Sequence, residues 1–155
     1  MLSGIHPILT GELLAHLDRM GHGDSLVIAD ANFPAYRLGR IVVEVSGMTA
    51  PAVLEAIRTV LPLDEYGGPA FGLMSSAGDD VAGVPAGVLL PVQQELLAFA
   101  DAPDDRTEAI ERFAFYEAAA SAVLIVRTGE SRAYGNAILR KGVVGAYRGP
   151  GAERG

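Results

Sequence analysis

Residues 25–30 read Ser-Leu-Val-Ile-Ala-Asp, a short and unbroken apolar run that ends in an acidic residue. A run of this kind is typical of a strand that is covered on both faces, as the strands of parallel sheets are. Other candidate strands along the chain are separated by segments whose apolar residues recur at helical spacing. This interleaving predicts an α/β fold, in which a single domain has a largely parallel central sheet flanked by helices.

The predicted helices are marked by capping residues and by apolar side chains three or four positions apart. Thr10 is a candidate N-cap, Leu13 and its successors continue the helix behind it, and Gly21 supplies the stop. Thr49 and Pro51 mark the start of a second helix that runs to residue 61. The other predicted elements are strands at 40–46, 70–75, 122–127 and 136–140, helices at 91–100 and 106–119, and a glycine-rich loop at 77–90.

The chain is long enough for one domain with its own core. It has 155 residues, half of them hydrophobic, and its 12 basic and 19 acidic residues give a net charge of −7. We expect a domain over residues 1–144 and a flexible C-terminal tail over 145–155. The apolar content excludes an intrinsically disordered chain, and its surplus on a small protein favours a homo-oligomer.

Composition also excludes several kinds of site and partner. Without cysteine, the chain has no disulfide, no thiolate nucleophile and no cysteine metal site. An acidic chain repels phosphate backbones, so nucleic acid is not an expected partner. No apolar stretch approaches the ~18 residues of a membrane span, and the N-terminus lacks the pattern of a signal peptide. We therefore expect a cytoplasmic protein without a membrane partner.

The common catalytic fingerprints are missing from the sequence. There is no nucleophile elbow, no Walker loop and no glycine-rich dinucleotide fingerprint. The histidines His6, His16 and His22 lack the spacing of a zinc site, so neither a metal nor a cofactor is expected. Proton transfer and simple ligand binding are therefore the two kinds of function that the sequence still allows.

His22 is the first candidate for proton transfer. It lies in Gly21-His22-Gly23-Asp24, between a predicted helix end and a strand. The flanking glycines leave the imidazole accessible, and histidine is the side chain that most readily exchanges protons near neutral pH. The alternative is a polar turn residue whose positive charge favours the end of the preceding helix.

Asp30 and the pair Arg112 and Tyr116 are candidates for ligand binding. Asp30 ends the first strand, and ligands of open α/β sheets bind outside the carboxyl ends of strands. Its alternative role is to cap a turn. Arg112 and Tyr116 share a predicted helix face, which suits a clamp for vicinal hydroxyls, but Glu108 and Arg112 could equally form an ordinary surface pair. Phe113 and Phe115 point to different sides of that helix, one inward and one toward a pocket or an interface.

Tyr134 and Asn136 begin the last predicted strand. Their hydroxyl and amide supply the mixture of donors and acceptors that a sugar requires, although a turn uses such residues for its backbone alone. Asp64 and Met74 are weaker candidates, each of which would be structural if taken alone.

In combination, these segments resemble the ribose pyranase/L-fucose mutarotase (RbsD/FucU) family over roughly residues 5–143. The segments at 32–35 and 113–116 favour its fucose branch. The resemblance is carried by Glu12-Leu-Leu, Arg19-Met-Gly-His-Gly-Asp24, Ala29-Asp30, Asn32-Phe-Pro-Ala35, Leu61-Pro-Leu-Asp64, Tyr66, Glu111-Arg-Phe-Ala-Phe-Tyr-Glu117, Thr128-Gly-Glu130, Tyr134-Gly-Asn136 and Leu139-Arg-Lys-Gly142.

The resemblance implies a sugar mutarotase that interconverts α and β anomers of L-fucose, or of a related monosaccharide, by acid–base ring opening. It also implies an RbsD-like fold that assembles into a ring, generally a decamer, with pockets near subunit contacts. Two alternatives are a non-catalytic sugar-binding or transport-accessory protein and a ribose pyranase. The residues that match the family's site are His22, Tyr116 and Asp64 for catalysis, and Asp30, Arg112, Tyr134, Asn136 and Met74 for sugar binding.

Overall fold

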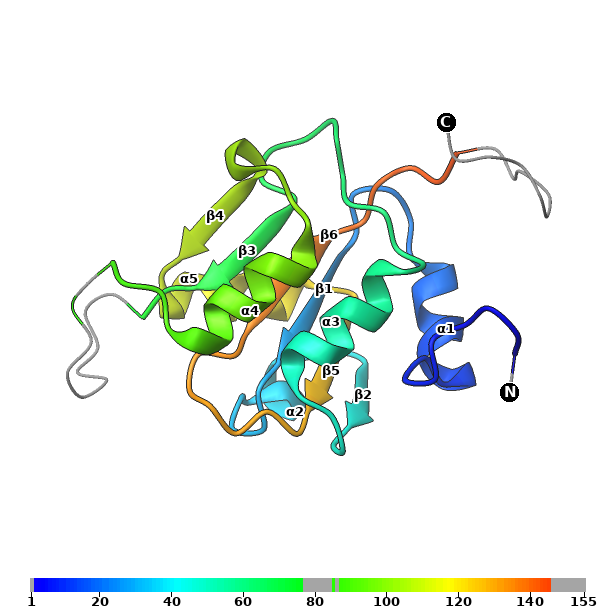
Figure 1. Cartoon of the computed structure of the whole chain (residues 1–155), viewed down its shortest axis with the longest axis horizontal. Helices are drawn as coiled ribbons and strands as arrows, with labels where there is room; N and C mark the ends of the chain where they lie inside the picture. Colours follow the sequence, from blue (N-terminus) through cyan, green and yellow to red (C-terminus); the bar gives the residue numbers. More distant parts are fainter. Residues whose placement is uncertain (1, 77–84, 86, 146–155) are drawn as a thin grey trace.

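Strands and helices alternate along the chain as predicted, in a computed structural model that describes residues 2–76, 85 and 87–145 (Figure 1). The predicted loop at 77–90 lies partly, and the predicted tail at 145–155 almost wholly, outside the described residues. The elements are α1 (Gly11–Arg19), β1 (Ser25–Ala29), α2 (Ala35–Leu38), β2 (Val42–Val45), α3 (Ala50–Arg58), β3 (Phe71–Met74), α4 (Pro91–Ala100), a 3-10 turn η1 (Asp104–Arg106), β4 (Thr107–Ile110), α5 (Arg112–Ser121), β5 (Leu124–Thr128) and β6 (Ala137–Arg140).

The strands form one six-stranded sheet in the order β2-β5-β1-β6-β3-β4. The pairs β2–β5, β5–β1 and β3–β4 are parallel, which confirms the prediction of a largely parallel sheet. β6 is the exception, since it runs antiparallel to both of its neighbours, β1 and β3. As a consequence, Ala137 at the start of β6 lies opposite Ile28 near the end of β1, and Arg140 lies opposite Ser25 at its start.

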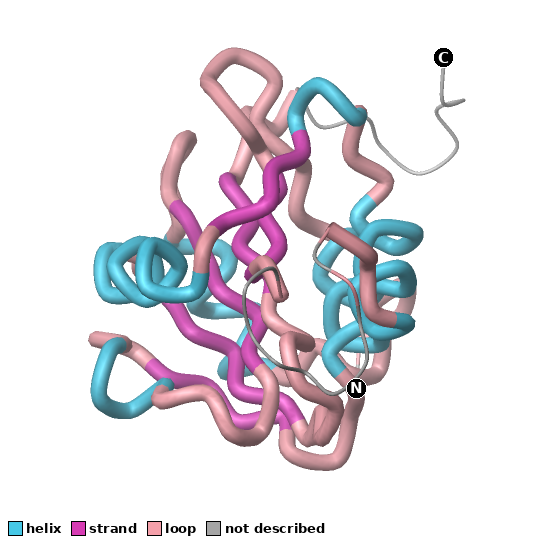
Figure 2. The backbone as a smooth tube through the Cα atoms, turned by 90° about the vertical axis from the view of Figure 1, so that its left-hand side faces the viewer, coloured by secondary structure: helices cyan, strands magenta, loops and turns pink. Residues whose placement is uncertain are grey.

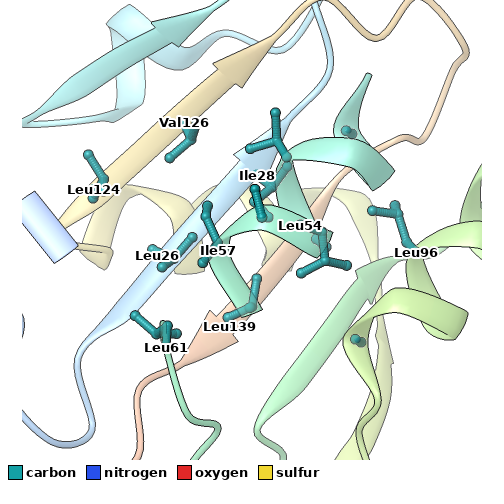
Figure 3. Packing of buried hydrophobic residues seen from close by; sticks show 14 of the residues in the cluster. Leu26, Ile28, Leu54, Ile57, Leu61, Leu96, Leu124, Val126 and Leu139 are labelled. Carbon is teal, nitrogen blue, oxygen red and sulfur yellow. The ribbon is translucent and has the colours of Figure 1, made fainter. Parts of the chain in front are cut away.

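Both faces of the central strands are covered, which explains the unbroken apolar run of β1. Leu26 and Ile28 pack on one face beneath α3 and α4, with Leu54 and Ile57 of α3 directly over them (Figure 3). Val27 and Ala29 face the opposite way and pack with Phe115 and other residues of α5. Helices accordingly lie on both sides of the sheet (Figure 2).

The first two long helices begin at the predicted caps. The Thr10 hydroxyl accepts a hydrogen bond from the backbone N–H of Leu13 at 3.2 Å. Thr49 accepts one from the backbone N–H of Ala52 at 3.4 Å, and Pro51 occupies the first turn of α3. Each cap satisfies an N–H group that has no partner within its helix, so the local sequence fixes where these helices start.

The helix predicted over 106–119 is wrong in its first part. Residues 107–110 form the edge strand β4, which pairs in parallel with β3 through contacts such as Phe71 with Thr107. α5 begins only at Arg112, because the Glu111 carboxylate caps it by accepting hydrogen bonds from Phe113 and Ala114 N–H groups. The alternative surface pair of Glu108 with Arg112 on one helix is also wrong, since Glu108 lies on the strand.

Two smaller differences concern the end of one helix and the presence of another. The helix predicted to run to residue 61 ends at Arg58, and the one-turn helix α2 was not predicted. In the described part of the chain, no helix combines the length and the apolar character that crossing a membrane requires.

Candidate functional site

Asp30 and Asn136 form the centre of a cup at one end of the sheet. Asp30 directly follows β1, and Asn136 directly precedes β6, so the antiparallel pairing of these strands brings the two residues together. The backbone N–H of Asp30 donates to Asn136 Oδ1 at 2.8 Å, and Asn136 Nδ2 donates to Asp30 Oδ2 at 2.6 Å. Both side chains are buried. This reciprocal pair fixes the direction of the carboxylate.

Burial raises the pKa of Asp30 above the ordinary value for aspartate, and the nearby charge of Glu130 adds to that effect. Hydrogen bonds from Asn136 and from the backbone N–H of Asn32, at 2.9 Å to Oδ1, oppose the rise. The result is a strong hydrogen-bond acceptor held in a partly dry environment, which suits recognition of hydroxyl groups.

The cup around this pair has a volume of about 270 Å³, which fits a small ligand. Its walls bring together five of the predicted binding or catalytic residues besides Asp30. Arg112 and Tyr116 come from the first turns of α5, Met74 ends β3, and Tyr134 precedes β6 together with Asn136. The remaining lining residues are Asn32, Phe33 and Ala133.

Aromatic rings form one wall of the cup. Phe33 lies edge-on to Tyr116, with ring centres 5.6 Å apart, and Phe113 also lies edge-on to Tyr116, at 6.2 Å. The Arg112 guanidinium lies over the Phe113 ring at 5.0 Å from its centre. Phe115 is fully buried while Phe113 is 61% exposed, which confirms that the two phenylalanines point to different sides. A wall of this kind, beside polar groups, suits the mixed surface of a sugar.

The loop before β6 is held by ionic contacts that sequence inspection did not single out. Glu130 is buried, and its carboxylate accepts hydrogen bonds from Arg132 Nε at 2.8 Å and Nη2 at 2.9 Å. Arg132 also donates to both carboxylate oxygens of Glu95 on α4, at 2.7 and 3.0 Å. Within this loop Tyr134 adopts a left-handed backbone conformation, with φ of 62°, which is uncommon for an aromatic residue. The contacts of Arg132 with Glu130 and Glu95 therefore hold the segment that carries Tyr134 and Asn136.

His22 lies elsewhere, paired with Asp64. His22 Nε2 is 3.0 Å from Asp64 Oδ1, and the Tyr66 ring lies edge-on to the imidazole at 6.1 Å. The backbone N–H of Tyr66 donates to the same Oδ1 at 3.0 Å. That bond, followed by the one from His22, lowers the pKa of Asp64. Asp64 is therefore ionised at neutral pH and accepts from Nε2–H, which leaves His22 Nδ1 for other contacts.

The resemblance to the family groups His22 with Asp30 in one site, but within one copy of the chain the two residues lie apart. His22 precedes β1 and Asp30 follows it, and a five-residue strand spans roughly 16 Å. Of the other two residues that match the family's catalytic positions, Asp64 lies with His22 and Tyr116 lies in the cup. The polar residues thus form two groups at opposite ends of the sheet.

Two further lining residues had a signal in the sequence. Asn32 and Phe33 follow Asp30 immediately, so they had to lie near any ligand held at the end of β1. The Glu95–Arg132 contact had none, because it joins a helix to a loop 37 residues later.

Comparison with known proteins identifies the family of this chain. The model of the RbsD / FucU transport protein family matches residues 3–144. An L-fucose mutarotase of Actinobacillus pleuropneumoniae is 39% identical over 147 residues, which cover 92% of this chain and 97% of the relative. A fucose mutarotase of Danio rerio is 41% identical over 150 residues, covering 93% of this chain and 95% of the relative.

Among solved structures, the fucose mutarotase of Streptococcus pneumoniae in complex with L-fucose superimposes with a TM-score of 0.78. It is 31% identical, and the match covers 92% of this chain and 99% of that one. The sequence matches and the fold lead to the same conclusion: the chain belongs to the RbsD/FucU family.

Proposed function

We propose that this protein is a mutarotase, an isomerase that interconverts the α and β anomers of L-fucose or a closely related monosaccharide. The observation that carries the proposal is the buried Asp30–Asn136 pair at the base of a small cup, ringed by Arg112, Tyr116 and Tyr134. Such a set can hold several hydroxyl groups of a sugar ring at once. Relatives named L-fucose mutarotase, at about 40% identity over nearly the whole chain, support the same activity.

Mutarotation needs only proton transfers. Ring opening adds a proton to the ring oxygen and removes one from the anomeric hydroxyl, and the bond between the anomeric carbon and the ring oxygen breaks. The freed aldehyde turns about one bond and the ring closes on its other face, with both protons returned. General acid–base groups contribute about 10²–10⁴-fold to steps of this kind. No oxidant, metal or covalent intermediate is required.

We assign the proton carrier to His22, through Nδ1. Its other nitrogen is held by the ionised Asp64, which orients the ring and stabilises the imidazolium that forms when Nδ1 takes a proton. The His22 side chain is 48% exposed, so it is open to a ligand. We assign Asp30, Arg112, Tyr134 and Asn136 to hold the sugar hydroxyls and Met74 to the wall. We assign the second proton to Tyr116, a proposal supported by its place in the lining of the cup.

Since one copy keeps His22 and the cup apart, the proposal requires that the two groups meet between copies. Exposed aromatic side chains accompany both groups, Tyr66 beside His22 and Phe113 beside the cup, at 77% and 61% exposure. Exposed aromatic residues of this size are typical of protein interfaces. We therefore infer a homo-oligomer in which His22 and Asp64 of one copy complete the cup of the next. The decameric ring and the cytoplasmic location stay predictions.

Saturation-transfer NMR tests the activity directly. Exchange between the α and β anomeric protons is measured with L-fucose, galactose and ribose, with and without protein. We expect acceleration with L-fucose, and a loss of at least about 100-fold in His22→Gln, the scale of a missing acid–base group. Sugar binding without acceleration would instead support a non-catalytic sugar-binding protein. Exchange between ribose ring forms alone would support a ribose pyranase.

Complementation tests the shared site. His22→Gln keeps its cup and Asn136→Ala keeps its histidine, so each variant alone should be nearly inactive. When equal amounts associate at random, about a quarter of the sites combine an intact histidine with an intact cup. We expect activity near that fraction after refolding the two together. A mixture as inactive as its parts contradicts a site shared between copies.

A further inference from the structure

The loop between α3 and β3 carries two side chains that interact with His22. Asp64 pairs with the imidazole, and the Tyr66 ring packs against it. The segment reads Leu61-Pro-Leu-Asp-Glu-Tyr-Gly-Gly-Pro-Ala70, and residues 65–69 are exposed. Two adjacent glycines give such a loop many conformations in solution. Something outside the loop must select the one in which Asp64 and Tyr66 face His22.

The start of the loop is anchored on the end of β6. The backbone N–H of Asp64 donates to the Arg140 carbonyl at 3.0 Å, and Gly142 N–H donates to the Pro62 carbonyl at 2.9 Å. The far end is anchored by Ala70, whose N–H donates to the backbone carbonyl of Arg106 at 2.8 Å. These bonds fix where the loop begins and ends, but they do not reach residues 65–68.

The Arg106 side chain holds that middle part. From the 3-10 turn η1, its Nη1 lies 3.3 Å from the Asp64 carbonyl, 3.1 Å from that of Gly67 and 3.5 Å from that of Gly68. Its Nη2 donates to the carbonyl of Glu65. One guanidinium thus gathers four carbonyl groups from five consecutive residues. A planar fork can do this, whereas a lysine ammonium is a single point of charge on a flexible stem.

The loop conformation that Arg106 holds is the one in which the Asp64 carboxylate is positioned against His22. With the loop folded around the guanidinium, the Tyr66 N–H points back to Asp64 Oδ1, the oxygen that His22 Nε2 also contacts. The Tyr66 bond is the main reason why the pKa of Asp64 is lowered. Loss of the Arg106 hydrogen bonds therefore affects the His22 imidazole through Asp64 and does not require a direct contact between Arg106 and the imidazole.

We infer that Arg106 is a positioning residue for the His22–Asp64 pair, acting through the backbone of residues 64–68. This inference rests on the proposed function only for its effect on rate, since the effect on the imidazole is independent of any activity. Arg106 directly precedes the edge strand β4, so the inference adds a residue to the proposed site that lies beyond the two ends of β1.

The test compares Arg106→Ala and Arg106→Lys with Arg19→Ala, which removes an exposed arginine at the end of α1. Nitrogen-15 NMR of the His22 ring reports which nitrogen carries the proton. We expect the wild type and Arg19→Ala to hold the proton on Nε2, and both Arg106 variants to show a mixture. In anomer exchange, we expect kcat to fall about 10- to 100-fold, the scale of a small misplacement of a catalytic group. We expect KM to stay within about twofold, because the residues assigned to hold the sugar hydroxyls are unchanged.

Thermal unfolding shows whether each variant is folded. If Arg106→Ala does not fold, the imidazole spectra and kcat of Arg106→Lys test the inference. A folded Arg106 variant with an unchanged imidazole and unchanged kcat overturns the inference and leaves only a stabilising role. If the wild type does not accelerate anomer exchange, the proposed function fails. The imidazole spectra still decide the role of Arg106 in that case.

Discussion

Asp30 and Asn136 bind each other in both directions, since each donates to the other through one hydrogen bond. The pair joins the end of β1 to the start of β6 across 106 residues of sequence. Its geometry leaves the carboxylate and amide no freedom to turn, so the cup is preorganised before a sugar enters. Preorganised polar groups bind with less loss of entropy than mobile ones.

Replacing Asn136 with Asp tests this pair with almost no change of shape. The substitution removes the Nδ2 donor and places a second carboxylate against Asp30. We expect L-fucose affinity, measured by calorimetry, to fall at least about tenfold, since hydrogen bonds to charged groups contribute about 1.5–3 kcal/mol. The matched control is Gln94→Glu, the same exchange of amide for acid at an exposed position of α4. Equal affinity of Asn136→Asp and the wild type contradicts the assignment.

The raised pKa of Asp30 predicts how sugar binding depends on pH. Because only the ionised Asp30 carboxylate accepts charge-assisted hydrogen bonds from the sugar hydroxyls, affinity should be full above its raised pKa and decline as pH falls through it. That decline begins above the ordinary aspartate value of about 3.9. Calorimetry at a series of pH values from neutral to acid measures it, and the weaker binding of Asp30→Asn should lack this limb.

The same shift has the opposite sign for stability. A carboxyl group whose folded-state pKa is raised stabilises the fold when protonated, so its contribution shrinks as pH rises from the unfolded value through the folded one. Denaturant unfolding of the wild type and Asp30→Asn across this interval measures the difference. A contribution of Asp30 that grows with pH there contradicts a raised pKa.

Much of the fold was predictable because its signals are local. The apolar run of β1, the hydroxyl caps of α1 and α3 and the spacing of their apolar residues each belong to a few consecutive residues. β4 was missed because Thr-Glu-Ala-Ile at 107–110 has no strand pattern of its own, and its conformation comes from pairing with β3. Tertiary context decides such edge segments.

The residues of the cup were predicted through the resemblance to the family, since each of them alone also had an ordinary structural explanation. The position of His22 within one copy was not predicted. Asp30, Asn136 and the start of α5 all follow or precede regular elements whose ends meet at one edge of the sheet. His22 was placed with them by the resemblance to the family, since its position between two glycines equally fits a polar turn residue. The strand between His22 and Asp30 was visible in the sequence, and its span of roughly 16 Å keeps the two residues apart within one copy of the chain.

Gly142 connects the end of β6 to the loop that carries Asp64. A Cβ at this position would lie 2.2 Å from the Leu63 carbonyl oxygen and 3.1 Å from the Asp64 N, both of them backbone atoms that cannot turn away. We expect Gly142→Ala to displace the loop and slow anomer exchange about tenfold or more, as misplaced catalytic groups do. Gly145→Ala, where a Cβ meets nothing within 4 Å, is the control and should keep the wild-type rate.

Arg132 has two carboxylate partners in unlike surroundings, which allows its contacts to be told apart. Glu130 is 2% exposed and Glu95 is 46% exposed. Arg132→Gln leaves the Glu130 carboxylate buried without its main partner, a loss of about 1–3 kcal/mol in the free energy of unfolding. Glu95→Gln removes only the exposed contact, so we expect a much smaller change in denaturant unfolding.

The pH dependence of that loss identifies Glu130 as its source. Arg132 lowers the pKa of Glu130, so the stabilisation is present above the unfolded value of about 4.3 and disappears as pH falls through the folded one. Wild type and Arg132→Gln should therefore differ most at neutral pH and converge in acid. Arg132→Gln should also bind L-fucose more weakly, because the contacts of Arg132 hold the loop in which Tyr134 adopts its left-handed backbone conformation. A gap in stability that stays constant with pH places the loss in packing instead of in the Glu130 charge.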